Sequence, residues 1–211
     1  DFNIENLSLD IEKLINTLQL NNNLTIVGHD WGSIVAWSVS SRGNVKIEKL
    51  VSICGGTEFP GTSVYDNLSF DKGHHYISTF QNPEEADKLL FKNLDLFFRS
   101  SYRITSKIDY DLLDLSLNSL FTTYSPNNKI HNIDIQSLTD HFYNGMKQPI
   151  SWYSNIDFNL ELSSQWRRKL DIDITFLFGE NDAAVKLTDN MINRLKSSGT
   201  NVTIKEVKNT D

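Results

Sequence analysis

The chain has 211 residues, 39% hydrophobic and 22% charged, which is typical of one globular domain or of a domain with an insertion. Its formal net charge of −7 argues against nucleic acid or an anionic membrane surface as the main partner. No apolar run approaches the roughly 18 residues that a membrane span needs. The single cysteine, Cys54, lies in the apolar run LVSICGG and is interpreted as a small buried hydrophobic side chain. Because it excludes an internal disulfide, we expect a reducing, cytoplasmic location.

The first third of the chain predicts a helix, a strand, a second helix and a second strand. LTIVG (24–28) is a short unbroken apolar run, typical of a strand that is buried on both faces. Residues 31–43 predict a helix that ends near Gly43, and residues 46–54 predict the second strand. The first helix ends before the asparagines at 21–23, and its apolar face carries Leu7, Ile11, Leu14, Ile15 and Leu18.

From about residue 66 to 165 the chain is rich in aromatic residues and its helical patterns are short. Asn82 and Pro83 predict a helix start, because proline is favoured at the first helical position. Residues 133–145 predict another helix of this region. The apolar face of the helix that starts at Pro83 is continued by Ala86, Leu90, Leu94 and Phe97.

The end of the chain returns to the first pattern, with a strand at 173–179, a helix at 183–199 and a strand at 201–207. Strands that alternate with helices predict an α/β fold with a parallel sheet flanked by helices. We therefore expect a core formed by residues 1–65 and 166–211, with a helical cap, residues 66–165, inserted between them.

A tight turn between the first strand and the second helix carries a carboxylate. Residues 28–32 read Gly-His-Asp-Trp-Gly, and Gly-x-Ser-x-Gly at such a junction is the nucleophile elbow of α/β-hydrolases. Here Asp30 occupies the position of the serine. An aspartate before a helix is often only an N-cap, but the complete frame of the elbow favours a nucleophile.

Four segments together resemble the epoxide hydrolases of the α/β-hydrolase superfamily, of the soluble type, over essentially the whole chain. The resemblance implies the α/β-hydrolase fold, here with a partial parallel sheet, and an inserted helical cap. It implies no cofactor and no metal. The segments are GHDWGSIVAW (28–37), YISTFQNPEEA (76–86), PISWYSN (149–155) and LFGENDAAV (177–185).

The resemblance implies a role for each matching residue. Asp30 would attack an epoxide carbon and form an ester, and Tyr76 and Tyr153 would hydrogen-bond the epoxide oxygen and protonate it as the ring opens. Asp182 would orient a histidine base. Trp31 would offer its backbone N–H to the oxyanion and its ring to the wall of the substrate pocket. The implied partners are a small apolar epoxide and water; the oligomeric state is not implied.

Two parts of the family pattern have no counterpart in these residues. The family places its catalytic histidine just after the last strand, and part of its oxyanion hole on a His-Gly-x-Pro loop before the first helix seen here. None of the five histidines follows the last predicted strand; they are His29, His74, His75, His131 and His141. We therefore expect an internal fragment of a longer hydrolase, inactive by itself.

Two other functions stay open. Haloalkane dehalogenases share the fold and an aspartate followed by tryptophan, but a halide leaves as a stable anion and needs no tyrosine pair as a proton source. A catalytically dead scaffold is favoured by the missing histidine and disfavoured by the presence of Asp30, Tyr76, Tyr153 and Asp182. No cluster of His, Cys and Asp has the spacing of metal ligands, and no Gly-rich phosphate loop occurs.

Overall fold

A computed structural model describes residues 2–20, 22–55, 76–101, 132–166, 169–180, 182 and 187–210. The chain divides into two compact units, each described here by itself. The sheet unit comprises residues 1–68 and 157–211, and the cap unit comprises residues 69–156. The helix α8 (Ile156–Ser163), which we expected in the cap, thus falls almost wholly in the sheet unit. The domain boundaries at 65 and 165 stay predictions.

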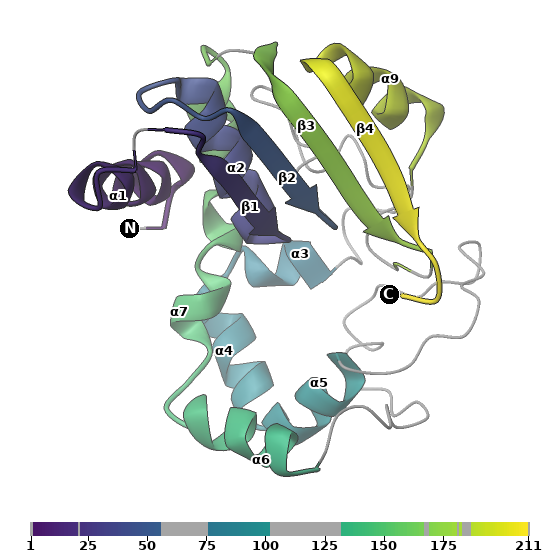
Figure 1. Cartoon of the computed structure of the whole chain (residues 1–211). Helices are drawn as coiled ribbons and strands as arrows, with labels where there is room; N and C mark the ends of the chain where they lie inside the picture. Colours follow the sequence, from purple (N-terminus) through teal and green to yellow (C-terminus); the bar gives the residue numbers. More distant parts are fainter. Residues whose placement is uncertain are drawn as a thin grey trace. The chain divides into compact units, whose positions relative to one another are not determined.

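Four parallel strands form the sheet, in the order β1-β2-β3-β4 (Figure 1). The register pairs His29 with Ile53, and Ile53 with Leu177, so the carboxyl ends of the first three strands meet at one edge. This arrangement confirms the expected α/β class, with a parallel sheet flanked by helices. The strands are β1 (Thr25–His29), β2 (Lys49–Ile53), β3 (Leu170–Gly179) and β4 (Gly199–Val207).

The helices of the sheet unit begin and end at residues that satisfy their terminal backbone groups. They are α1 (Ile4–Thr17), α2 (Trp31–Arg42), α8 and α9 (Asp189–Ser197). Asn3 caps α1, and α2 ends at Gly43, whose φ of 67° suits a glycine. The predicted helix at 183–199 is shorter in the structure, because Thr188 caps α9 and Gly199 already belongs to β4.

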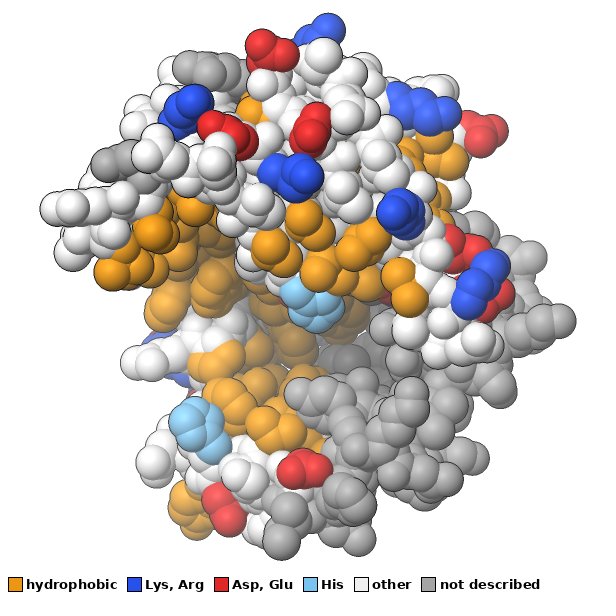
Figure 2. Space-filling model, viewed as in Figure 1, with side chains coloured by type: hydrophobic (Ala, Val, Ile, Leu, Met, Phe, Trp, Pro, Cys, Tyr) orange, Lys and Arg blue, Asp and Glu red, His pale blue; other side chains and the backbone are white. Residues whose placement is uncertain are grey.

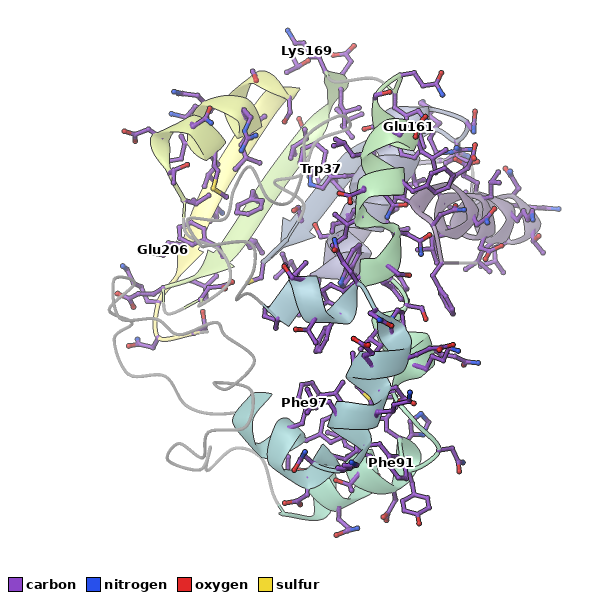
Figure 3. The ribbon with its side chains drawn as sticks, turned by 180° about the vertical axis from the view of Figure 1, so that it is seen from behind. Trp37, Phe91, Phe97, Glu161, Lys169 and Glu206 are labelled. Carbon is purple, nitrogen blue, oxygen red and sulfur yellow. The ribbon has the colours of Figure 1, made fainter. Side chains whose placement is uncertain are left out.

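A hydrophobic core joins α2 and α9 to the sheet. Trp37 of α2 is 1% exposed and packs with residues of β2 and β3 (Figure 3). The burial of these large side chains is the main force that fixes α2, and with it the turn that precedes α2, on the sheet. The buried cluster consists of Ala36, Trp37, Leu50, Leu170, Ile174, Phe176 and Leu195.

The expectation that β1 is buried on both faces is wrong for this structure. Of the described strands, β1 pairs only with β2, so it is an edge strand, and Val27 is 60% exposed. The apolar face of α1 is likewise only partly covered: Ile15 is buried, but Leu14 and Leu18 are more than half exposed. Figure 2 shows hydrophobic side chains gathered on the face that carries α1 and β1.

The cap unit is helical in its described part. Asn82 caps α4 by accepting the N–H of Glu85, and Pro83 begins the helix, as predicted. The predicted apolar face divides between α4 and α5, because the first helix ends at Phe91. The elements are α3 (Tyr76–Phe80), α4 (Pro83–Phe91), α5 (Leu94–Ser101), α6 (Asn132–His141), α7 (Lys147–Ile150) and the 3-10 turn η3 (Tyr153–Asn155).

The cap unit has a hydrophobic core of its own. Phe97 packs against this core, whereas Phe91 lies at the surface of the unit and is 46% exposed (Figure 3). Within the part of the chain that the structure describes, no helix has the length and apolarity to cross a membrane. The buried residues of the cap core are Phe80, Ala86, Leu90, Leu94, Phe98, Ile135, Met146 and Ile150.

Candidate active site

Asp30 lies at the turn between β1 and α2 in a strained backbone conformation. Its φ is 51° and its ψ is −123°, a region that residues other than glycine rarely occupy. Such a conformation costs about 1–3 kcal/mol and persists only where the surrounding structure holds it. Gly28 makes the turn sterically feasible, because a Cβ atom there would lie 2.2 Å from the carbonyl oxygen of Gly32. A Cβ atom at Gly32 would meet nothing within 4 Å, so no steric clash requires a glycine at this position.

Hydrogen bonds on three sides hold Asp30. Its backbone N–H donates to the carbonyl of Ile53 at 3.0 Å, and its own carbonyl accepts the N–H of Ser33 at 2.9 Å. Its carboxylate oxygen Oδ2 accepts the N–H of Trp31 at 2.6 Å. An ordinary N-cap bonds the second or third N–H of the helix, whereas Asp30 bonds the first. The N–H of the next residue, Trp31, therefore holds the Asp30 side chain at the start of α2.

The environment of Asp30 disfavours the charged form of its carboxyl group. Desolvation by the surrounding protein raises the pKa of Asp30 above its ordinary value, although the residue as a whole is exposed to solvent. The hydrogen bond from Trp31 and the nearby His29 act in the opposite direction, and the nearby Asp182 raises the pKa further. The structure therefore brings Asp30 and Asp182, both predicted site residues, into electrostatic contact.

Asp182 follows β3 and is 6% exposed. Its N–H donates to the carbonyl of Gly179 at 3.2 Å, which fixes the turn after the strand. Burial raises the pKa of Cys54 to about 12, and the hydrogen bond of its thiol with Asp182 is the second cause. Cys54, which we interpreted only as a buried hydrophobic side chain, is half-buried and lies beside the acid. No sequence pattern predicts this contact, because the two residues follow different strands.

The two predicted cap tyrosines contact each other within the cap unit. The ring centroids of Tyr76 and Tyr153 are 6.0 Å apart, and Phe80 lies 5.5 Å from the first and 5.1 Å from the second. All three contacts are edge-to-face, the geometry that aromatic pairs prefer. Tyr76 begins α3 and Tyr153 begins η3, so two short helical elements bring the phenols together. Phe80, one of the cap aromatics that suggest an apolar pocket in the sequence, thus contacts both tyrosines.

The predicted site residues divide between the two units of the chain. Asp30, Trp31 and Asp182 lie in the sheet unit, while Tyr76 and Tyr153 lie in the cap unit. His74, His75 and His131 lie outside the described residues, as do positions 181 and 183–185 of the acid segment. In the described part of the chain, no group of three or more His, Cys, Asp and Glu side chains could hold a metal ion.

The fold and this elbow define the class of protein to which the chain is similar. Solved epoxide hydrolases have the same fold over 99% of the chain: one from an endophytic Streptomyces (TM-score 0.79, 15% identity, 67% of that protein covered) and one from Vigna radiata (TM-score 0.75, 20% identity, 70% covered). The chain therefore has the α/β-hydrolase fold, as the sequence predicts. No family model matches the chain.

Two curated relatives from Caenorhabditis elegans are similar in sequence as well. Epoxide hydrolase 1 is 25% identical over 194 residues, which are 89% of this chain and 43% of that protein. Epoxide hydrolase 2 is 35% identical over 107 residues, which are 48% of this chain and 30% of that protein. The chain thus matches less than half the length of either relative.

Proposed function

We propose that the protein hydrolyses epoxides to vicinal diols through a covalent ester on Asp30. The observation that carries this proposal is the strained conformation of Asp30 at the carboxyl end of β1. Hydrogen bonds of its N–H, its carbonyl and its carboxylate hold this conformation. Strain of this kind costs stability and is characteristic of functional sites. The similarity to epoxide hydrolases in sequence and fold supports the choice of epoxides as substrates.

The hydrogen bond of Trp31 supports different tasks for the two carboxylate oxygens of Asp30 in this proposal. Oδ1 attacks an epoxide carbon, the carbon–oxygen bond of the ring breaks, and an ester forms. Oδ2, which accepts the Trp31 N–H, becomes the carbonyl oxygen of that ester. When water attacks this carbonyl, the negative charge develops on Oδ2, where the N–H is already in place to stabilise it. Collapse of this intermediate releases the diol and restores the carboxylate.

Tyr76 and Tyr153 would supply the proton that ring opening requires. The epoxide oxygen leaves as an alkoxide, and a phenol that hydrogen-bonds it can transfer a proton as the charge develops. Two phenols from different helical elements that contact each other and Phe80 suit one shared acceptor atom better than two separate ones. A haloalkane would need no such donor, so the tyrosine pair favours the epoxide.

Asp182 would act on the hydrolytic step. In the proposed mechanism, a base removes a proton from the attacking water, and the buried carboxylate of Asp182 orients that base and stabilises its positive charge. Its low exposure and its closeness to Asp30 support this placement. None of the described residues that follow β4 is a histidine, so the base is not assigned to a residue of this chain.

The test is a paired assay of the complete gene product. It is incubated with an apolar aryl epoxide and, separately, with an apolar haloalkane, and diol and halide are measured. The proposal expects diol without halide, and loss of the diol in Asp30→Asn. Halide release that depends on Asp30 would replace the proposal with a dehalogenase. Absence of both products would indicate a scaffold without activity.

A further inference from the structure

A small hydrogen-bond network with buried side chains lies behind the elbow. Ser33 of α2 and Ser52 of β2 are both 0% exposed, and their hydroxyl oxygens are 2.7 Å apart. The carbonyl oxygen of Gly55 lies 2.9 Å from the Ser33 hydroxyl and 2.6 Å from the Ser52 hydroxyl. The indole N–H of Trp37 donates to the Ser52 hydroxyl at 3.2 Å. No role in the proposed chemistry accounts for these polar groups.

The number of hydrogens decides how this network works. The two hydroxyl groups have two hydrogens for three oxygen–oxygen contacts, so only two of those contacts are hydrogen bonds at one time. Ser52 accepts from Trp37, and the contact of its own hydroxyl with the Gly55 carbonyl, the shortest of the three, favours donation of its hydrogen to that carbonyl. Ser33 donates either to Ser52 or to the same carbonyl. In both arrangements, the Gly55 carbonyl is the end point of the network.

Gly55 in turn contacts the backbone of Asp30. A Cβ atom at Gly55 would lie 2.6 Å from the carbonyl oxygen and 2.9 Å from the Cα atom of Asp30. The turn that contains Gly55 also includes Ile53, whose carbonyl accepts the Asp30 N–H, and Cys54, whose N–H donates to the carbonyl of Leu177. The network therefore fixes a turn whose backbone packs directly against the strained residue.

We propose that Ser33 and Ser52 are positioning residues for Asp30: by holding the Gly55 carbonyl they keep the turn after β2 against the elbow and so maintain the conformation that presents the Asp30 carboxylate. The predicted effect on catalysis rests on the proposed function. The inference that the two serines hold the turn does not depend on it. The strain at Asp30 requires surroundings that leave it no alternative, and a buried, fully satisfied network provides them.

The experiment compares Ser33→Ala and Ser52→Ala with the control Ser40→Ala in the complete gene product. Ser40 lies on the same helix, is 7% exposed, and donates its hydroxyl to the carbonyl of Ala36 at 2.8 Å, so it matches the buried serines without touching the turn. Two quantities are measured: kcat and KM for the epoxide, and the rate at which iodoacetamide alkylates Cys54 in the native protein, read by peptide mass spectrometry.

We expect Ser52→Ala to lower kcat on the order of 10- to 100-fold with little change in KM, because a displaced nucleophile loses its attack geometry. We also expect faster alkylation of Cys54, because its turn is no longer held. Ser33→Ala should act in the same direction and less strongly, and Ser40→Ala should change neither quantity even if it lowers the unfolding temperature.

Two outcomes would overturn the inference. In one, Ser52→Ala leaves the alkylation of Cys54 unchanged, whatever its effect on kcat. In the other, Ser40→Ala changes both quantities as much as Ser52→Ala, which would indicate a general loss of stability. If the unmodified protein makes no diol, the proposed function fails, and the alkylation rates still decide whether the serines hold the turn.

Discussion

The rings of Tyr76 and Tyr153 meet in an edge-to-face contact with an interplanar angle of 77°, and Phe80 contacts both. Phe80 is 4% exposed and belongs to the core of the cap unit. A buried ring that contacts both tyrosines restricts their rotamers, and restricted donors lose less entropy when they bind a substrate oxygen. The cap core therefore serves two purposes in our account: it folds the cap unit and it orients the two phenols.

We predict that Tyr76→Phe and Tyr153→Phe each slow formation of the ester. Loss of one donor to a developing oxyanion costs about 2.7–4 kcal/mol in other enzymes, and the cost here should be lower because a second donor remains. Pre-steady-state measurement of the first turnover gives the rate, and Tyr143→Phe, at a tyrosine that is 66% exposed, is the control. Unchanged rates in both single variants would mean that the tyrosines only pack.

We predict that Asp30→Asn is inactive and, at neutral pH, more stable than the unmodified protein. The pKa of Asp30 is raised in the folded state, so folding disfavours the ionised carboxylate. This cost is absent below the ordinary value of 3.8, grows between 3.8 and the raised value, where the folded protein still holds a proton that the unfolded chain has lost, and is constant at higher pH. The measurement is the free energy of unfolding of both proteins as a function of pH. A difference that does not change with pH would contradict the prediction.

We predict that an ion pair between α1 and α2 stabilises the sheet unit. The guanidinium of Arg42 donates to Glu12 at 2.7 Å, with 10% and 7% of the two side chains exposed, and lies 5.4 Å from the ring centre of Trp166. Removing one partner of a buried pair costs about 3–5 kcal/mol, and Glu12→Gln should fall near or below the lower end because Glu5 remains 3.4 Å from Arg42.

Denaturant unfolding of Glu12→Gln measures this cost. Asp10→Asn, on the exposed side of α1, is the matched control and should change stability by no more than about 0.5 kcal/mol. The double variant Glu12→Leu with Arg42→Met should lose less than the sum of its parts. Additive losses would mean that the two side chains act independently.

We predict that residues 1–211, expressed by themselves, associate through β1. An exposed apolar edge strand offers unpaired backbone groups to another chain, and Val27 is the most exposed apolar residue of β1. Val27→Lys should increase the monomer fraction in size-exclusion chromatography. Val207→Lys, on the other edge strand, is the control. Equal effects of both substitutions would indicate a general effect of charge.

Much of the fold could be predicted because its signals are local. The apolar runs at 24–28 and 173–179 and the glycine frame around Asp30 each specify a strand or a turn without reference to distant residues. The apolar run of β1 predicts the strand itself but does not specify how far the strand is covered, since the pattern is the same for a covered and an exposed strand. For the same reason Leu14 and Leu18 were expected on the covered face of α1 and are exposed.

In the candidate site, too, the features with a local sequence motif could be predicted, and those that depend on contacts between distant residues could not. Asp30 has a motif of its own, whereas the pairing of Tyr76 with Tyr153 came from the resemblance and not from spacing. Cys54 and the serines behind the elbow carried no signal, because their contacts join the ends of separate strands that come together only in the folded sheet. Ser33 and Ser52 in particular have ordinary positions in a helix and a strand, and only their mutual distance reveals a network.

The ester on Asp30 is the central claim, and one labelling measurement tests it. The complete gene product, in excess over an epoxide in water enriched in oxygen-18, completes a single turnover, and the peptide that contains Asp30 and the diol are analysed by mass spectrometry. Our account predicts label in Asp30 and none in the first diol, because the oxygen that enters the diol comes from the carboxylate and water replaces it. Label in the first diol with none in Asp30 would mean that water attacks the epoxide directly, and the account would be wrong.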